Sequence, residues 1–153
     1  MFTVGVDLTG FRQVAAKTVQ ALQFGARDAA RNAAQEGAQE ARTVGRFKNQ
    51  TGRLRAGIVA EFVRSSENSA RWDIISKARY SKFVEQGTRP HVIVPVRAVA
   101  LRFVINGRVI FASKVNHPGT QPMPFMGPAY LKAEAVMYRE IGIAVLKVQN
   151  LWN

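Results

Sequence analysis

The sequence contains two histidines, His91 and His117, and each stands next to a proline. Glu85 precedes the first histidine by a few residues, and imidazole and carboxylate groups together suit zinc or iron. No spacing such as His-Glu-x-x-His supports a metal site, however. A hydrolase built on these groups is therefore the weakest functional hypothesis. We expect no metal and no other cofactor, and we expect each histidine to hydrogen-bond to backbone in a tight turn.

Other catalytic arrangements are missing from the sequence. The chain has no cysteine, which excludes disulfides, thiolate metal sites and cysteine nucleophiles. It has no glycine-rich phosphate loop and no Gly-x-Ser-x-Gly motif, and its acidic residues are too sparse to nominate an acid and base pair. We therefore predict no catalytic residue and no enzymatic activity.

Charge is the strongest compositional signal, because the net charge is +12. From Arg89 to Phe125 the chain has five basic residues and no acidic one. Such a segment can neutralise nucleic-acid phosphates, or it can be a solvated face that meets an acidic neighbour. No known DNA- or RNA-binding motif accompanies the charge, so both alternatives stay open. The candidates for contact with DNA are Arg46, Lys48, Arg97, Arg102, Arg108 and Lys114.

An α+β fold in a single domain, residues 1–153, is expected to position these side chains. Residues 2–8 alternate between apolar and other side chains, which indicates a strand. A long helix is predicted over about 11–42, and its second half carries a stripe of alanines. This stripe packs either on the protein's own sheet or on a neighbouring subunit. The N-terminus has no signal peptide and no apolar run is long enough to span a membrane, so we expect a soluble, unexported chain.

An antiparallel (mixed) β-sheet of two hairpins is predicted over about 57–113, packed against the two long helices. Asn106-Gly107 is the dipeptide best suited to a type I′ turn in the second hairpin. Residues 115–125 contain three prolines and a glycine, which predicts an extended loop without regular structure. A C-terminal helix over about 128–150 should dock across the sheet through an apolar stripe. The members of that stripe are Leu131, Ala135, Tyr138, Ile141, Val145, Val148 and Trp152.

The segment 78–91 is predicted to be the centre of this organisation. Tyr80, Phe83 and Val84 are spaced to lie on one face of a short helix. Gly87 should end that helix, and Pro90 prevents it from resuming. The residues that follow should leave as an extended arm. The predicted fold anchors are Tyr80, Phe83, Val84, Gly87, Pro124 and Pro128.

Three sequence stretches together resemble a known family. The first is Thr51-Gly52-Arg53-Leu54-Arg55, and the second is Tyr80-Ser81-Lys82-Phe83-Val84-Glu85-Gln86-Gly87-Thr88-Arg89-Pro90-His91. The third joins His117-Pro118-Gly119-Thr120 to Pro124-Phe125-Met126-Gly127-Pro128-Ala129. In this order they resemble the tail-completion or head–tail joining (neck) proteins of long-tailed bacteriophages, also described as tail components or minor tail protein Z-like. The resemblance covers roughly 50–131. Ser81 departs from the usual alanine, and Gly127 from a basic or polar residue.

The resemblance implies a structural virion protein of the phage neck, which forms a homo-oligomeric ring, expected to be a hexamer, at the head-proximal end of the tail. Its implied partners are further copies of itself, neighbouring neck and tail-tube proteins, and DNA in the channel, with no membrane. It would reside in the virion, and in the host cytoplasm during assembly. Tail completion, tail termination and head–tail joining remain alternatives, and a basic nucleic-acid-binding module is the alternative function.

The arm from Arg89 to Pro95 and the loop from Asn116 to Phe125 are predicted to reach a neighbouring subunit. The residues assigned to that interface are Arg89, Pro90, His91, Val92, Val94, His117, Pro118, Gly119, Thr120 and Phe125.

Overall fold

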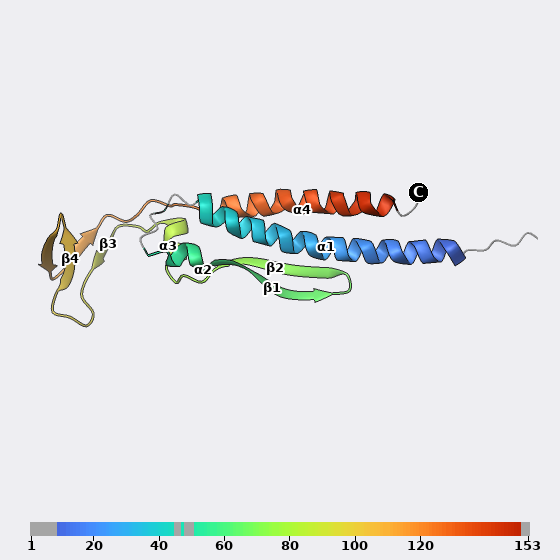
Figure 1. Ribbon diagram of the computed structural model, residues 1–153. Coiled ribbons are helices and arrows are strands. Elements are labelled where there is room, and N and C mark those ends of the chain that lie inside the picture. The colour runs from blue at the N-terminus through green and yellow to red at the C-terminus, as the bar shows by residue number, and fades with distance from the viewer. Residues whose placement is uncertain (1–8, 45–46, 48–50, 151–153) are drawn as a thin grey trace, which may run out of the picture. The chain divides into compact units, whose positions relative to one another are not determined.

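The computed structural model describes residues 9–44, 47 and 51–150 (Figure 1). The strand expected over residues 2–8 lies outside this range, as do Arg46, Lys48 and Trp152. In chain order the described elements are α1 (Thr9–Val44), α2 (Arg53–Gly57), β1 (Ile58–Ser66), β2 (Ser69–Ser76), α3 (Ser81–Gln86), β3 (His91–Ile93), β4 (Leu101–Ile105), β5 (Arg108–Ala112), β6 (Val115–His117) and α4 (Met126–Gln149).

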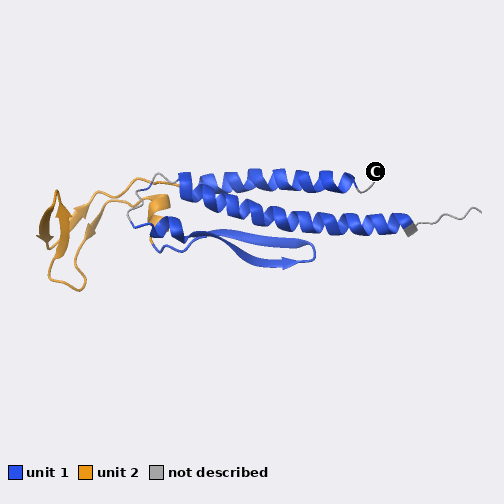
Figure 2. Ribbon diagram, viewed as in Figure 1, with its two compact units in different colours: residues 1–79, 125–153 blue, residues 80–124 orange. Residues whose placement is uncertain are grey.

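The α+β class is confirmed, with long helices at both ends of the chain and antiparallel hairpins between them. The chain divides into two compact units (Figure 2). Unit 1 comprises residues 1–79 and 125–153, and unit 2 comprises residues 80–124. Whether these units act as the single domain expected from the sequence stays a prediction.

Unit 1 is built around α1, which packs along the antiparallel α4 and against the hairpin of β1 and β2. The alanine stripe of α1 forms the centre of this packing, so it is covered within the chain itself. A Cβ atom on Gly37 would lie 2.6 Å from Ile74 Cδ1 and 2.8 Å from the carbonyl oxygen of Ala129. Small side chains on α1 therefore let both neighbours approach its backbone closely. The buried members of the stripe are Ala29, Ala30, Ala33, Ala34, Ala38 and Ala41.

The first predicted hairpin is confirmed as β1 and β2, which pair from Ile58 opposite Ser76 to Ser66 opposite Ser69. A register shift between Phe62 and Arg64 interrupts the ladder. Arg27 of α1 holds the turn of the hairpin, because its guanidinium donates to the carbonyl oxygens of Ser66 and Glu67 at 2.7 and 3.2 Å. Unit 1 is thus a continuous packing of two helices and one hairpin.

The expected burial of α4 needs correction. Leu131, Tyr138, Ile141 and Val145 are exposed, whereas Ala129 and Val136 are buried along with Val148. The reason is that α4 meets α1 through small side chains, so the helix is turned toward its alanine-containing side. The large apolar residues expected in the core lie on its flank.

Unit 2 contains α3 and two separate two-stranded sheets, β3 with β6 and β4 with β5. The two hairpins predicted from the sequence are both present, but the strands form three two-stranded sheets in place of one sheet over 57–113. The expectation of no regular structure after residue 114 is wrong for Val115–His117, which pairs with β3. These residues precede the first proline of the segment, Pro118, so their N–H donors remain available for pairing.

Candidate functional site

Unit 2 is joined at its base by two matched segments, Gly87-Thr88 and Gly119-Thr120, which we call the clasp. The Thr88 N–H donates to the Thr120 carbonyl oxygen at 3.0 Å, and the Thr120 N–H donates to the Thr88 carbonyl oxygen at 3.1 Å. The two threonine Oγ1 atoms lie 3.1 Å apart and form a further hydrogen bond. The clasp therefore fixes the two chain segments side by side before the strands begin.

Both glycines of the clasp are required by its geometry. Gly87 has φ 70° and Gly119 has φ 87°, a region that L side chains disfavour. A Cβ atom on Gly87 would also overlap the carbonyl oxygen of Thr120, and one on Gly119 would overlap that of Thr88. The sequence shows the same relation as a short repeat, because Gly-Thr-Arg-Pro begins at residue 87 and Gly-Thr-Gln-Pro at residue 119. Gly87, which was expected to end the short helix, therefore also permits close contact with the backbone of Thr120.

Beyond the clasp, β3 and β6 form a short ribbon in which His91 lies directly opposite His117. The rings stack with their centroids 5.0 Å apart and their planes at 30°. His91 Nδ1 lies 2.8 Å from the carbonyl oxygen of Arg89, and the Gly119 N–H donates to His117 Nδ1 at 3.0 Å. Each histidine therefore hydrogen-bonds to nearby backbone, as expected. In the part of the chain that is described, no three His, Cys, Asp or Glu side chains gather to hold a metal ion.

The ribbon places the two segments assigned to a subunit interface side by side. Arg89, Pro90, His91, Val92 and Val94 are exposed on one of them. On the other, Pro118 and Thr120 are exposed, while His117 and Gly119 are half-buried. Their role in an interface stays a prediction, but a single surface now carries both segments.

Phe125 behaves differently from the rest of that set. Its side chain is only 1% exposed and its ring makes an edge contact with Phe47 at 5.4 Å between centroids. It belongs to the core of unit 1, so we do not retain it among the interface residues. The neighbouring prolines led to the prediction that Phe125 lies in an exposed loop, whereas its burial shows that it is a core residue.

The predicted anchors of α3 are largely exposed within the described residues. Tyr80 is 43% exposed and Phe83 is 59% exposed, while Val84 is half-buried. Backbone bonds hold this helix, because the carbonyl oxygen of Tyr80 accepts from Phe83 and that of Val84 accepts from Met123 at 2.9 Å. Pro124 is exposed, and Pro128 lies half-buried in the first turn of α4. The anchoring role assigned to these side chains stays a prediction.

The hairpin of β4 and β5 exposes several apolar side chains. Asn106 and Gly107 both have positive φ, 48° and 77°, as the predicted type I′ turn requires. In the register of the pair, Arg102 faces Phe111 and Val104 faces Val109, so these four side chains share one side of the sheet. The three apolar members are 57% (Val104), 47% (Val109) and 66% (Phe111) exposed. We call these four residues the hairpin face.

The basic residues proposed to contact DNA do not form a single stripe. Arg97, Arg102, Arg108 and Lys114 are all exposed. Arg108 lies opposite Ile105 in the pairing of β4 with β5, which places it on the other side of the sheet from Arg102. Contact with DNA thus stays a prediction for these four residues, and Arg102 and Arg108 each lie among apolar side chains on opposite sides of the hairpin.

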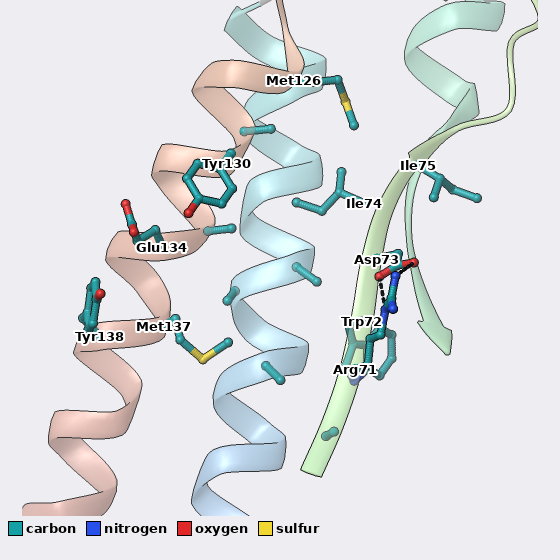
Figure 3. A pocket seen from close by; sticks show the side chains of 16 residues that line it. Arg71, Trp72, Asp73, Ile74, Ile75, Met126, Tyr130, Glu134, Met137 and Tyr138 are labelled. Atoms are coloured by element: carbon teal, nitrogen blue, oxygen red, sulfur yellow. Dashed lines mark hydrogen bonds and ion pairs between the residues drawn. The ribbon is translucent and has the colours of Figure 1, made fainter. Parts of the chain in front are cut away.

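A groove of about 770 Å³ opens on unit 1 between α4 and β2, with α1 as its floor (Figure 3). The floor consists of Ala30, Ala33 and Ala34, and the β2 side includes Trp72 and Ile74. This groove was not predicted from the sequence. The sequence feature that could have indicated it is a set of side chains four residues apart on α4. They form a ridge that lines the groove and is not buried. The members of that ridge are Met126, Tyr130, Glu134 and Tyr138.

The charged groups of the groove are arranged unequally. On the β2 side Arg71 donates to both carboxylate oxygens of Asp73, at 2.9 and 3.0 Å (Figure 3). The hydrogen bond from Arg71 lowers the pKa of Asp73 below its usual range. On the α4 side Glu134 makes no ion pair with any residue that the structure describes. The groove is therefore an apolar surface with one uncompensated carboxylate.

Comparison with known families finds a similarity over slightly less than half of the chain. Residues 13–87 match the family described as "Bacteriophage HK97-gp10, putative tail-component". The match begins in α1 and ends at the first glycine of the clasp, and it confirms the resemblance to a bacteriophage tail family. No curated protein and no solved structure matches the chain. The family supports a structural role in a phage tail, and none of the described helices is long and apolar enough to cross a membrane.

Proposed function

We propose that this tail component is a subunit of the virion neck and forms a ring, with six copies expected, at the head-proximal end of the tail. The observation that carries the proposal is that no side chain of residues 80–124 is buried, although the segment is rich in apolar residues. A two-stranded hairpin is at best marginally stable by itself in water. Contacts with neighbouring molecules would supply the burial that unit 2 lacks.

The proposal assigns partners to the exposed surfaces. Further copies of the chain contact the ribbon and the hairpin face, while neck and tail-tube proteins bind the two ends of the ring. DNA in the central channel of the ring would contact the basic side chains outside the hairpin face, which are Arg97, Arg108 and Lys114. Tail completion, tail termination and head–tail joining are the alternative neck roles, and assembly would take place in the host cytoplasm.

Electron microscopy of phage particles tests this proposal. Deletion of the gene should leave filled heads and tails that are separate, and expression of the full chain from a plasmid should restore joined particles. Gold labelling of an epitope tag on the restored chain should mark the head–tail junction. Label along the tube or at the distal tip of the tail would contradict the neck assignment, even though both positions agree with a tail component.

A second candidate function is binding to nucleic acid, which the acid-free segment with its exposed basic residues favours. Replacement of Arg97, Arg102 and Arg108 with glutamine should weaken binding to duplex DNA and flatten its salt dependence. The slope of log K against log salt should fall in size by up to about 0.9 for each phosphate that the variant no longer neutralises. Glutamine variants of Arg12, Lys17 and Arg64, which are exposed in unit 1, provide the control. No measurable binding at low salt would end this hypothesis.

A further inference from the structure

We propose that the hairpin face of one copy binds in the groove of the next copy, with Arg102 opposite Glu134. This inference rests on the ring assembly proposed above and names the two surfaces that would build it. The hairpin face belongs to unit 2 and the groove to unit 1, so every copy would offer one of each.

The hairpin face is suited to enter an apolar groove. Val104, Val109 and Phe111 project from one side of a two-stranded sheet and are about half exposed or more. Arg102 lies on the same side of the sheet. The stretch from Arg89 to Phe125, which includes it, contains no acidic residue. The arginine makes no ion pair with the described residues. The face therefore combines three apolar side chains with one cation.

The groove has the complementary composition. The half-buried side chains of Trp72, Ile74 and Met137 offer apolar contact above the buried alanine floor. The Asp73 carboxylate is already engaged by Arg71, which leaves Glu134 as the carboxylate available to a cation (Figure 3). Glu134 lies between Tyr130 and Tyr138 on the ridge of α4, and these two rings are 64% and 71% exposed. Each surface therefore combines apolar area with one available charged side chain, and the two charges are opposite in sign.

Charge also disfavours the simplest alternative, in which two hairpins pair with each other. Each hairpin carries Arg102 and Arg108 and no acidic residue, so a symmetric contact would bring like charges together. A contact between two different surfaces is heterologous. Contacts of this kind repeat from copy to copy and close into a ring when the rotation permits. The proposed pairing thus provides the chain with a head-to-tail mode of assembly.

Cysteine cross-linking tests the contact, because the natural chain has no cysteine. The full-length double variant Val104→Cys/Tyr130→Cys is treated with a short bismaleimide, both as purified protein over a range of concentrations and in particles. A head-to-tail contact should produce a ladder of covalent oligomers on a denaturing gel. The double variant Val104→Cys/Phe24→Cys is the matched control, because Phe24 is exposed but does not line the groove. It should produce no ladder.

Three outcomes would overturn the proposal. Dimers from Val104→Cys alone would indicate a symmetric contact between hairpins. A cross-link within the monomer would show that the chain's own hairpin occupies the groove. No cross-link between positions 104 and 130, in solution or in particles, would show that these surfaces do not meet.

Charge reversal tests the polar part of the contact. Arg102→Glu and Glu134→Arg should each lower the ladder yield of the cysteine variant by roughly tenfold, since each places like charges together. The combined reversal should restore most of the yield. A combined variant that stays as weak as the single variants would contradict the assigned pair. Circular dichroism of each variant confirms that the helices of unit 1 are intact.

The result can be separated from the neck assignment. Failure of the cross-link with label at the head–tail junction would reject the interface and leave the function standing. A ladder with label elsewhere on the tail would retain the interface and reject the neck assignment.

Discussion

The interactions that stabilise unit 1 internally differ from those that stabilise unit 2. Every buried hydrophobic side chain among the described residues belongs to unit 1, where helices approach each other through alanine and glycine. Unit 2 has no buried side chain, and it relies on backbone hydrogen bonds at the clasp and along two short sheets. Unit 1 therefore has the properties of an independent folding unit, whereas unit 2 has those of a segment shaped in advance for a partner.

This difference indicates where mutations should affect folding and where they should affect assembly. Burial of apolar area is the dominant stabilising term in a domain, so changes inside unit 1 should lower its free energy of unfolding. Changes on exposed surfaces usually have small effects on stability. Unit 2 should therefore tolerate substitutions that nevertheless abolish binding.

The largest expected effect comes from a matched pair of phenylalanines. Phe125→Ala removes a ring that is 1% exposed, and it should lower the free energy of unfolding by about 3–5 kcal/mol. Phe111→Ala removes a ring that is 66% exposed, and it should change that free energy by no more than about 0.5 kcal/mol. Urea unfolding followed by circular dichroism measures both. Similar losses for the two variants would break the distinction between the units.

A pair of glycines tests the close approach inside unit 1. Gly37→Ala should destabilise the protein by about 1–3 kcal/mol, because the added methyl group would overlap Ile74 and the backbone of Ala129. Gly142→Ala in α4 meets no atom within 4 Å. It should stabilise the protein by about 0.5–1 kcal/mol, since alanine favours the helix. Thermal unfolding compares the two. A stabilising Gly37→Ala would show that α1 and its neighbours have room to separate.

The same comparison can be made at the clasp of unit 2. Gly87→Ala and Gly107→Ala both place a methyl group on backbone with positive φ, which L side chains disfavour by about 1–3 kcal/mol. Only Gly87→Ala also overlaps the carbonyl oxygen of Thr120. It should speed hydrogen exchange at the amides of Thr88 and Thr120 and leave the amides of α1 unchanged. Faster exchange in α1 as well would show that the two units unfold together.

Local sequence patterns were sufficient to predict several elements. Helical periodicity predicted α1 and α4 with ends within two residues of those observed, and alternation with Asn106-Gly107 predicted the two hairpins. These features depend on neighbours along the chain. One half of the clasp is predictable, because Gly87 is expected to end a helix. Gly119 is assigned to a loop and to a subunit interface, and nothing in the sequence pattern pairs it with Gly87.

Features that depend on distant residues could not be predicted in this way. Pairing of β3 with β6 joins segments on either side of the second hairpin, and no periodicity in three residues reveals a partner. The apolar residues of α4 indicated a buried stripe, yet the alanines of α1 selected another side of the helix. Alanine buries little area, so its stripe carries almost no hydrophobic signature in the sequence. The groove exists because α4 packs on α1 through this other side. It could not be predicted, because the alanine stripe does not indicate which side of α4 will be buried.

The smallest expected effect is electrostatic and again concerns the pair of long helices. Glu36 of α1 accepts a hydrogen bond from Arg139 of α4 at 3.1 Å and lies 3.3 Å from the Lys132 Nζ atom. These contacts, chiefly the hydrogen bond from Arg139 and then that from Lys132, hold the pKa of Glu36 below its ordinary value of 4.5. The folded state therefore favours the ionised carboxylate. Its contribution to stability is complete above the ordinary pKa and is lost as the pH falls through the folded value.

Glu36→Gln should accordingly lower the free energy of unfolding by only about 0.2–1 kcal/mol at neutral pH, because the three side chains are well exposed to solvent. The difference from the natural chain should shrink as the solution is acidified and the natural carboxylate becomes protonated. Glu67→Gln, at the turn of the first hairpin, removes a carboxylate without an ion pair among the described residues and should show no such trend. Thermal midpoints over an acid-to-neutral series measure the effect. If the difference in thermal midpoint between Glu36→Gln and the natural chain stayed unchanged in acid, the charge of Glu36 would not be its cause. The contact between α1 and α4 at this position would then be stabilised by packing and not by electrostatics.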